Sequence, residues 1–151
     1  MKSKANGFAL MDIMLAVALL GILVVVMTPA IKYAMNRVKS FASERIIDKV
    51  DQALNLYSID VGNFPKSKEG GLVALLKRPQ GPFGEDWKGP YLEGVKFMED
   101  SDGTISVFDQ WNRVIEYHNP PVNFPEKFKQ YELFSLGANE DDPNGYIKRG
   151  R

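Results

Sequence analysis

A single carboxylate lies within the long apolar segment at the start of the chain. Residues 8–28 carry Asp12 as their only charged side chain. A carboxylate inside a bilayer costs at least ~2.5 kcal/mol, so such a residue is a candidate for function. It must pair with a cation or become protonated, and no Lys or Arg lies between residues 13 and 31. The remaining cations are Lys2 and Lys4, a lipid headgroup, or a free α-amine on another chain. Alternatively, Asp12 lies close enough to the membrane edge to reach water.

A second group of candidate ligands lies near the C-terminus. Residues 140–145 read EDDPNG and gather carboxylate and amide oxygens, the hard ligands that Ca²⁺ requires. An EF-hand is excluded, because its twelfth position, where a bidentate glutamate belongs, is Arg151. The alternative is a solvated acidic turn that pairs with the basic tail at residues 148–151.

Catalytic motifs are missing from the sequence. His118 is the only histidine and lies beside Asn119-Pro120-Pro121, in a predicted loop where histidine usually serves as a surface residue. There is no G-x-S-x-G elbow, H-E-x-x-H motif or phosphate-binding loop. Cysteine is absent, which excludes disulfides, thiolate metal sites and cysteine nucleophiles. We therefore predict that the protein has no catalytic residue and is not an enzyme.

The charge balance argues against nucleic acid as a partner. The chain has 19 basic and 19 acidic residues and a formal net charge of zero. No basic stripe with interleaved aromatic residues is present, as a nucleic-acid groove would require. Partners must therefore be recognised by shape and local chemistry.

The element that positions Asp12 is a predicted transmembrane helix at residues 8–28, long enough to cross the hydrocarbon layer. The alternative is a secretory signal peptide with a weak cleavage site at residues 28–30. The apolar run is longer than the roughly 7 to 15 residues of a signal peptide, and the helical pattern continues beyond it. Pro29 removes a backbone bond and is expected to kink or loosen the helix. Gly62-Asn63 is expected to end it.

Beyond the membrane, the helix is predicted to have one packed face and other faces in water. The apolar residues recur at steps of three or four: Ile31, Met35, Val38, Ala42, Ile46, Val50, Ala53 and Tyr57. Charged residues are expected on the water-facing sides: Lys32, Arg37, Lys39, Glu44, Asp48 and Asp51.

The remaining residues predict a small antiparallel β-sheet on which the long helix packs, which makes the fold α+β. Residues 105–107, 113–117 and 131–135 are rich in β-branched and aromatic residues. Asp102-Gly103 and Asn112 mark the turns between them. A short helix is expected to place one apolar face against the core, with Leu72, Val73, Leu75 and Leu76 on it. Four aromatic residues are expected in the core or in packed turns: Trp87, Tyr91, Trp111 and Tyr117.

The start of the chain resembles the class III signal of type IV pilins and of the pseudopilins of type II secretion. In that family a short basic leader ends in Gly, the mature chain begins with Phe or Met, and its fifth residue is acidic. Gly7, Phe8 and Asp12 occupy these positions. The resemblance implies leader cleavage after Gly7, N-methylation of Phe8, and pairing of Asp12 with the free amine of a neighbouring subunit during assembly. The family usually has glutamate in the last position, so Asp12 is a departure.

The rest of the chain resembles the major pseudopilins of type II secretion more narrowly. The matching segments follow in the family's order: NFP at 63–65, EGGLVALLKRP at 69–79, WKGPYL at 87–92, DQWNRVIEY at 109–117 and YELFSLG at 131–137. Phe64 replaces the usual tyrosine of the first segment. The resemblance implies a pilin-like fold with a leader at residues 1–7, a long N-terminal helix at 8–62, its transmembrane part at 8–28, and a periplasmic globular domain at 63–151.

By this resemblance the chain is a structural subunit of the type II secretion pseudopilus. Subunits would be drawn from the inner membrane into a helical filament that drives export of folded proteins through the outer membrane. The implied partners are further copies of the chain, minor pseudopilins, the prepilin peptidase, the inner-membrane assembly platform and, indirectly, the secretin. The implied location is the bacterial inner membrane, crossed once, with the globular domain in the periplasm.

Two other functions share the N-terminal features. The first is a type IV pilin or minor pilin for adhesion, motility or DNA uptake, although such pilins commonly carry a C-terminal cysteine pair that this chain lacks. The second is a membrane-anchored periplasmic enzyme, for which no motif argues.

The resemblance also implies a calcium site that differs from an EF-hand. In major pseudopilins a leucine carbonyl in the S-L-G turn joins an aspartate shortly after it and a later aspartate pair. The corresponding residues are Leu136, Asn139, Asp141 and Asp142. Asn139 replaces the usual aspartate, which removes one negative charge, and the loop before the acidic pair is several residues shorter.

Overall fold

The computed structural model describes residues 10–101 and 103–151 of the chain. It divides into two compact units, one ending at Val38 and the other covering Lys39–Arg151. The predicted leader, Gly7, Phe8 and the turn residue Asp102 lie outside the described residues.

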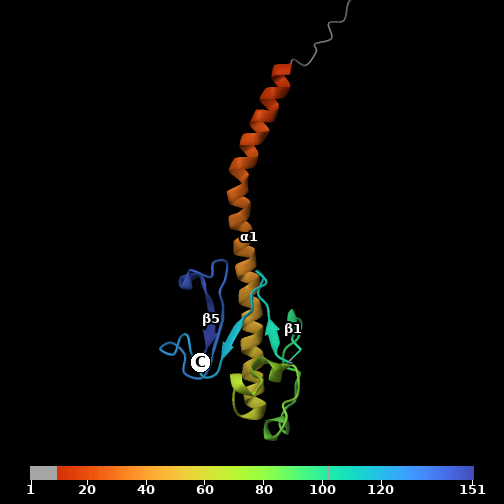
Figure 1. Cartoon of the computed structure of the whole chain (residues 1–151), viewed down its shortest axis with the longest axis vertical. Helices are drawn as coiled ribbons and strands as arrows, with labels where there is room; N and C mark the ends of the chain where they lie inside the picture. Colours follow the sequence, from red (N-terminus) through yellow and green to blue (C-terminus); the bar gives the residue numbers. More distant parts are fainter. Residues whose placement is uncertain (1–9, 102) are drawn as a thin grey trace, which may run out of the picture. The chain divides into compact units, whose positions relative to one another are not determined.

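One long helix, α1, spans Leu10–Val61 (Figure 1). It ends where the sequence predicted, because Gly62 adopts a left-handed φ of 87° and its N–H donates to the carbonyl of Ser58 at 2.9 Å. Pro29 lies inside the helix without ending it. Proline removes only its own N–H from the ladder, and the adjacent Thr28 hydroxyl adds a 2.8 Å bond to the carbonyl of Val24.

The packed face of α1 lies in the second unit. Its first two residues are each displaced by one position from the predicted stripe. The side chains that α1 buries are Ser43, Ile47, Val50, Ala53, Leu54 and Tyr57. The predicted stripe coincides with this face from Val50 to Tyr57. The prediction is wrong for the N-terminal residues of the stripe, because Ile31, Met35 and Val38 are more than half exposed.

Two small antiparallel sheets replace the single predicted sheet. The first pairs β1 (Phe97–Glu99) with β2 (Ile105–Val107), and the second has the order β3 (Glu116–His118), β4 (Glu132–Ser135), β5 (Ile147–Gly150). A lone bridge between Phe108 and Val114 connects the end of β2 to the approach of β3. The chain turns between them at Asn112, whose φ is 62°. The predicted strand at 113–117 is therefore divided, and only its end pairs with β4.

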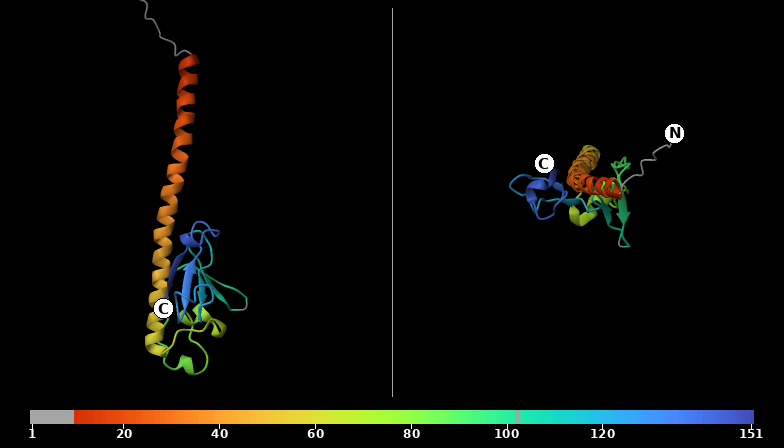
Figure 2. Two further views of the ribbon diagram at one scale, coloured as in Figure 1. Left: turned by 90° about the vertical axis from the view of Figure 1, so that its left-hand side faces the viewer. Right: turned by 90° about the horizontal axis from the view of Figure 1, so that it is seen from above.

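Both sheets lie on the same side of the second-unit part of α1 (Figure 2). Between α1 and β1 run three short 3-10 helices, η1 (Ser67–Glu69), η2 (Gly71–Leu75) and η3 (Pro82–Gly84). The predicted short helix is η2, which buries Leu72 and Leu75. A fourth, η4 (Pro143–Gly145), precedes β5.

The core of the second unit is formed by the packed face of α1, by η2 and by the inner residues of both sheets. Tyr117 and Tyr131 are buried in it with ring centroids 5.9 Å apart. Trp87 and Tyr91 pack against its edge, and the Trp87 indole donates to the carbonyl of Ala74 at 2.8 Å. The predicted aromatic packing is thus confirmed for these residues, and Trp111 is half-buried.

Candidate functional site

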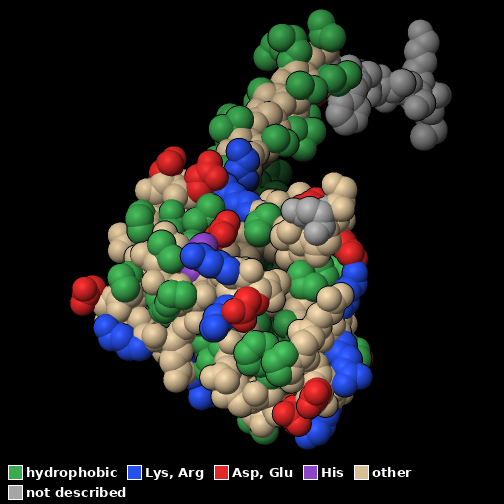
Figure 3. Space-filling model, turned by 60° about the horizontal axis from the view of Figure 1, so that its bottom comes forward, with side chains coloured by type: hydrophobic (Ala, Val, Ile, Leu, Met, Phe, Trp, Pro, Cys, Tyr) green, Lys and Arg blue, Asp and Glu red, His purple; other side chains and the backbone are tan. Residues whose placement is uncertain are grey.

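Within the described residues, the first unit presents an apolar helix surface that is not buried. An 18-residue window of α1 has a mean hydropathy of 2.8, and none of it is buried. Large apolar side chains remain more than half exposed from Leu10 to Val38, and hydrophobic atoms cover the segment that Figure 3 shows. By length and composition this helix can cross a membrane.

Asp12 belongs to this apolar surface. It lies in the first described turn of α1 with an exposed side chain, and Met11 and Ile13 beside it are exposed too. A carboxylate in such surroundings requires a compensating charge or a proton once lipid or protein covers the helix. Gly7 and Phe8, which the family resemblance groups with Asp12, lie outside the described residues.

In the second unit, polar contacts fix α1 against the sheets. The Tyr131 hydroxyl donates to Asp51 at 2.6 Å, and the Arg149 guanidinium pairs with Asp48 at 2.8 Å. Asp60 accepts from the Tyr91 hydroxyl and from the Lys88 ammonium, which together hold the pKa of Asp60 below its usual value. Asp48 and Asp51 were predicted on the water-facing side. Asp48 keeps 45% of its side chain exposed, and both carboxylates also accept from basic or phenolic partners on distant segments, which the sequence did not predict.

The turn at residues 109–113 is tied to both α1 and β4. Buried Asp109 accepts from the N–H groups of Trp111 and Arg113 through Oδ1 and from the Ser135 hydroxyl through Oδ2 at 2.6 Å. The N–H of Gln110 donates to Ser43 of α1 at 3.0 Å. These bonds account for the buried Ser43 on an otherwise apolar helix face.

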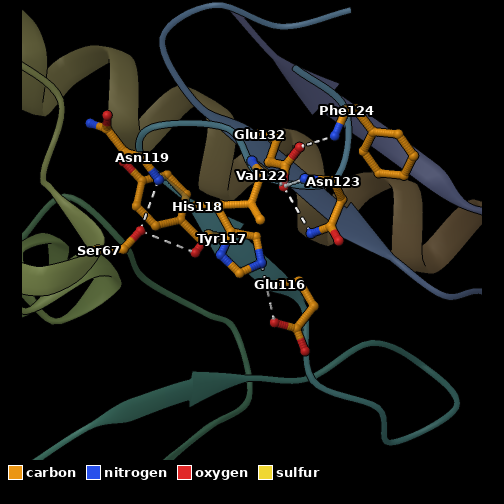
Figure 4. A network of polar contacts seen from close by, with 9 residues as sticks. All are labelled: Ser67, Glu116, Tyr117, His118, Asn119, Val122, Asn123, Phe124 and Glu132. Carbon is orange, nitrogen blue, oxygen red and sulfur yellow. Dashed lines mark hydrogen bonds and ion pairs between the residues drawn. The ribbon is translucent and has the colours of Figure 1, made fainter. Parts of the chain in front are cut away.

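Glu132 organises the long loop between β3 and β4 (Figure 4). It has no exposed surface, and it accepts from the N–H groups of Val122, Asn123 and Phe124 and from the Asn123 amide, at 2.6 to 3.1 Å. Burial alone raises the pKa of the carboxyl, but these hydrogen bonds to the anion outweigh burial and lower the pKa overall. The sequence analysis missed this role, although a charged residue inside the apolar strand YELFS was a visible signal.

His118 lies at the end of β3 and not in the predicted loop. Its Nε2 lies 3.8 Å from Glu116 on the same strand, and its ring is 6.2 Å from that of Phe134. The nearby Ser67 hydroxyl is engaged by the backbone of Tyr117 and Asn119 (Figure 4). Within the described residues, the hydrogen bonds therefore join His118 to no serine nucleophile.

The acidic loop near the C-terminus uses its side-chain oxygens on its own backbone. Asn139 Oδ1 accepts from the N–H of Asp141, and Asp142 Oδ1 accepts from the N–H of Asn144, each at 3.1 Å. The Tyr146 hydroxyl donates to the carbonyl of Glu140 at 2.5 Å. The loop thus holds two side-chain-capped turns before β5.

The four residues predicted to bind calcium do not fit a calcium site in this arrangement. Ca²⁺ takes six to eight oxygens that converge on one point. Here two of the expected ligand oxygens accept backbone hydrogen bonds, and within the described residues no three acidic or histidine side chains gather as a metal site. The Lys148 ammonium reaches into the loop and donates to the carbonyl of Pro143 at 2.8 Å.

The comparisons with known proteins identify the family. The family model described as type II secretion system, protein G, matches residues 31–148, which include the packed part of α1, both sheets and the acidic loop. The chain belongs to this family. The match favours the secretion function over the type IV pilin alternative.

Relatives in the protein G family match most of the length of the chain. The core protein G of Pseudomonas aeruginosa is 29% identical over 140 residues, covering 91% of this chain and 87% of the relative. That of Vibrio cholerae is 29% identical over 118 residues, covering 70% and 79%. The crystal structure of the major pseudopilin from enterohaemorrhagic Escherichia coli has the same fold, with a TM-score of 0.54 at 17% identity over 78% of this chain and 91% of that one.

Family membership agrees with the main features of the structure. The α+β fold with one long N-terminal helix is that of a pseudopilin. The apolar first unit is consistent with a membrane-anchored protein. The family is a structural one, and protein G is a core component of type II secretion in the relatives named above.

Proposed function

We propose that the chain is the structural subunit of the type II secretion pseudopilus, and that it polymerises into the helical filament that drives folded proteins through the outer membrane. One observation carries this proposal: a long helix whose apolar half is unburied continues into a folded domain of the protein G family. Such a surface requires lipid before assembly and neighbouring helices afterwards. No other proposed function accounts for both parts.

The assembly step that we propose joins one charge on each of two subunits. Cleavage after Gly7 by the prepilin peptidase exposes the α-amine of Phe8, which is then methylated. This amine of one subunit pairs with the Asp12 carboxylate of the next. In a filament core of low dielectric constant, the attraction within this pair offsets the cost of burying both charges. A subunit whose Asp12 stays unpaired is therefore hindered from entering the filament.

We further propose the inner membrane and the periplasm as the locations of the two units. The first unit crosses the membrane once, and the second unit lies in the periplasm. There it joins further copies of the chain and minor pseudopilins above the assembly platform. The resulting filament drives exported proteins towards the secretin. Disruption of the gene should then trap exported proteins in the periplasm and leave twitching motility and DNA uptake intact.

The mass and N-terminal sequence of the protein from membranes test the proposal. We expect residues 1–7 to be absent and Phe8 to carry one methyl group. A mature chain that begins after Ala30 would instead show a cleaved signal peptide, and the proposed anchor and filament core would be lost. Expression in cells that lack the prepilin peptidase is the control, since the full precursor should then accumulate.

A further inference from the structure

The two ends of the acidic loop meet in a tight backbone contact. Gly137 has a φ of 67°, and a Cβ at this position would lie 2.6 Å from the carbonyl oxygen of Gly145. A side chain at this position would clash with the backbone and would also be strained at this φ. The segment 137–145 is therefore a closed loop, and it carries three carboxylates, Glu140, Asp141 and Asp142. These carboxylates are exposed to solvent, and the cations that reach the loop bind its backbone at the two ends.

One cation reaches the loop from the turn at residues 109–113. Arg113 Nη1 donates to the carbonyl of Gly137 at 2.6 Å. The backbone N–H of Arg113 is itself held by buried Asp109, and its carbonyl accepts from the N–H of Asp109 at 2.9 Å. The turn that carries Arg113 is thus fixed at both ends, and it positions the guanidinium at the beginning of the loop.

A second cation reaches the other end of the loop from β5. The Lys148 ammonium donates to the carbonyl of Pro143 at 2.8 Å, and it lies 4.6 Å from the ring centre of Phe124 and 5.4 Å from that of Tyr146. The faces of aromatic rings attract a cation, so these rings help to hold the ammonium in this position. The neighbouring Arg149 is not available for this role, because it pairs with Asp48 of α1.

We propose that Arg113 and Lys148 together replace a bound divalent cation as the positive charge that closes this loop, so that the fold does not depend on Ca²⁺. Both cations donate to backbone carbonyls at the two ends of the loop, and the loop's own Asn139 and Asp142 oxygens are satisfied by backbone N–H groups. A calcium ion would have to displace the Lys148 ammonium or lie beside it, against like-charge repulsion. The proposal concerns the folded state and does not depend on the proposed function.

The first test uses the unaltered full chain in detergent micelles. We expect its melting temperature to change by less than about 1 °C between excess chelator and about 5 mM Ca²⁺, a concentration well above the roughly 0.1 to 1 mM dissociation constants of extracellular calcium modules. A ligand that binds only the native state raises the melting temperature by mass action. A rise of several degrees with Ca²⁺ that chelator reverses would overturn the proposal.

The second test removes one cation and keeps its aliphatic stem. We expect Lys148→Met to lower the melting temperature by about 2–4 °C and to speed hydrogen exchange at the N–H of Gly145, which donates to the carbonyl of Asp142. The control is Lys127→Met, because Lys127 lies 5.1 Å from the ring centre of Phe128 but outside the loop. It should melt like the parent chain. If Lys148→Met also melts and exchanges like the parent chain, the loop is not held by this cation.

Discussion

At the scale of single residues, the second unit depends on carboxylates that are paired inside the fold. Glu132 and Asp109 are both buried, and each accepts hydrogen bonds from a backbone turn. A buried carboxylate that receives several N–H donors is stabilised as an anion, whereas the same group without them would be strongly destabilising. These two residues therefore hold the 109–113 turn and the 119–128 loop in place.

Glu132 should make the stability of the second unit sensitive to acid. Its pKa is lowered in the folded state, so its contribution is complete above the unfolded pKa of about 4.3 and is lost as the pH falls through the lower folded value. Glu132→Gln should cost about 2–3 kcal/mol at pH 7 and flatten the decline of the melting temperature below about pH 4.3. Melts of both proteins between pH 2 and pH 7 check this. A parallel decline in the two would contradict it.

The sequence was informative about some of these residues and not about others. Asp12 is identifiable from sequence alone, because a lone charge in an apolar run is anomalous without knowledge of its neighbours. Arg113 and Lys148 are not, because an exposed-looking basic residue gives no sign of the backbone carbonyl that it binds in the folded chain. Glu132 gave a partial signal as a charge in an apolar strand, but its partners in the preceding loop could not be read from the sequence. Asn139 was assigned a ligand role by family position, and the structure shows its oxygen bound within the loop.

At the scale of elements, α1 has two parts that differ in the burial of their apolar side chains. Up to Val38 its apolar residues are exposed, and from Ser43 to Tyr57 one face is buried in the core of the second unit. The opposite face of that lower part remains open, with Leu56 and Ile59 more than half exposed. Burial, and not composition, therefore distinguishes residues that stabilise the domain from residues available to other chains.

Two leucines of α1, two residues apart, test this distinction. Leu54 has no exposed surface, whereas Leu56 is 52% exposed. Leu54→Ala should cost about 2–5 kcal/mol of unfolding free energy, because it leaves a cavity in the core. Leu56→Ala should change that free energy by less than about 0.5 kcal/mol. Urea unfolding of the three proteins in micelles gives both values, and equal losses would mean that the packed face is misassigned.

The elements were predictable where the local signal was strong. The helix end at Gly62 and the apolar residues of β2 and β4 follow from local sequence. β1 and β5 were missed, because the three residues FME and the four residues IKRG show no alternation of apolar and polar side chains and contain only one β-branched residue, Ile147. Pairing with β4 and the bonds of Arg149 and Lys148 define β5, and these are tertiary features.

At the scale of the whole molecule, the chain combines an apolar anchor with a domain that contains no disulfide, since the sequence has no cysteine. Such a subunit can leave the bilayer only if the cost of moving Asp12 and the apolar surface is met by other subunits. We therefore expect assembly to require the apolar helix together with the second unit, and not the second unit alone.

Substitutions of Asp12 should separate anchoring from assembly. We expect Asp12→Ala to insert into the membrane normally but to reduce filament formation at least tenfold, because the amine of the neighbouring subunit loses its counter-charge. Asp12→Glu, which restores the usual residue of the family, is the matched control and should assemble at least as well as the parent chain. Immunoblots of filaments sheared from the cells measure the filament formation of both variants. Normal filaments from Asp12→Ala would refute the charge pairing.

The polar contacts along the lower part of α1 also have a mechanical consequence. Ser43, Asp48, Asp51 and Asp60 bind groups on the sheets and loops at four levels of the helix. A rotation of this helical segment about its own axis would break all of these contacts together, along with the packed face between Ile47 and Tyr57. Torque applied to this part of α1 is therefore transmitted to the sheets, and the domain turns with the helix instead of slipping around it.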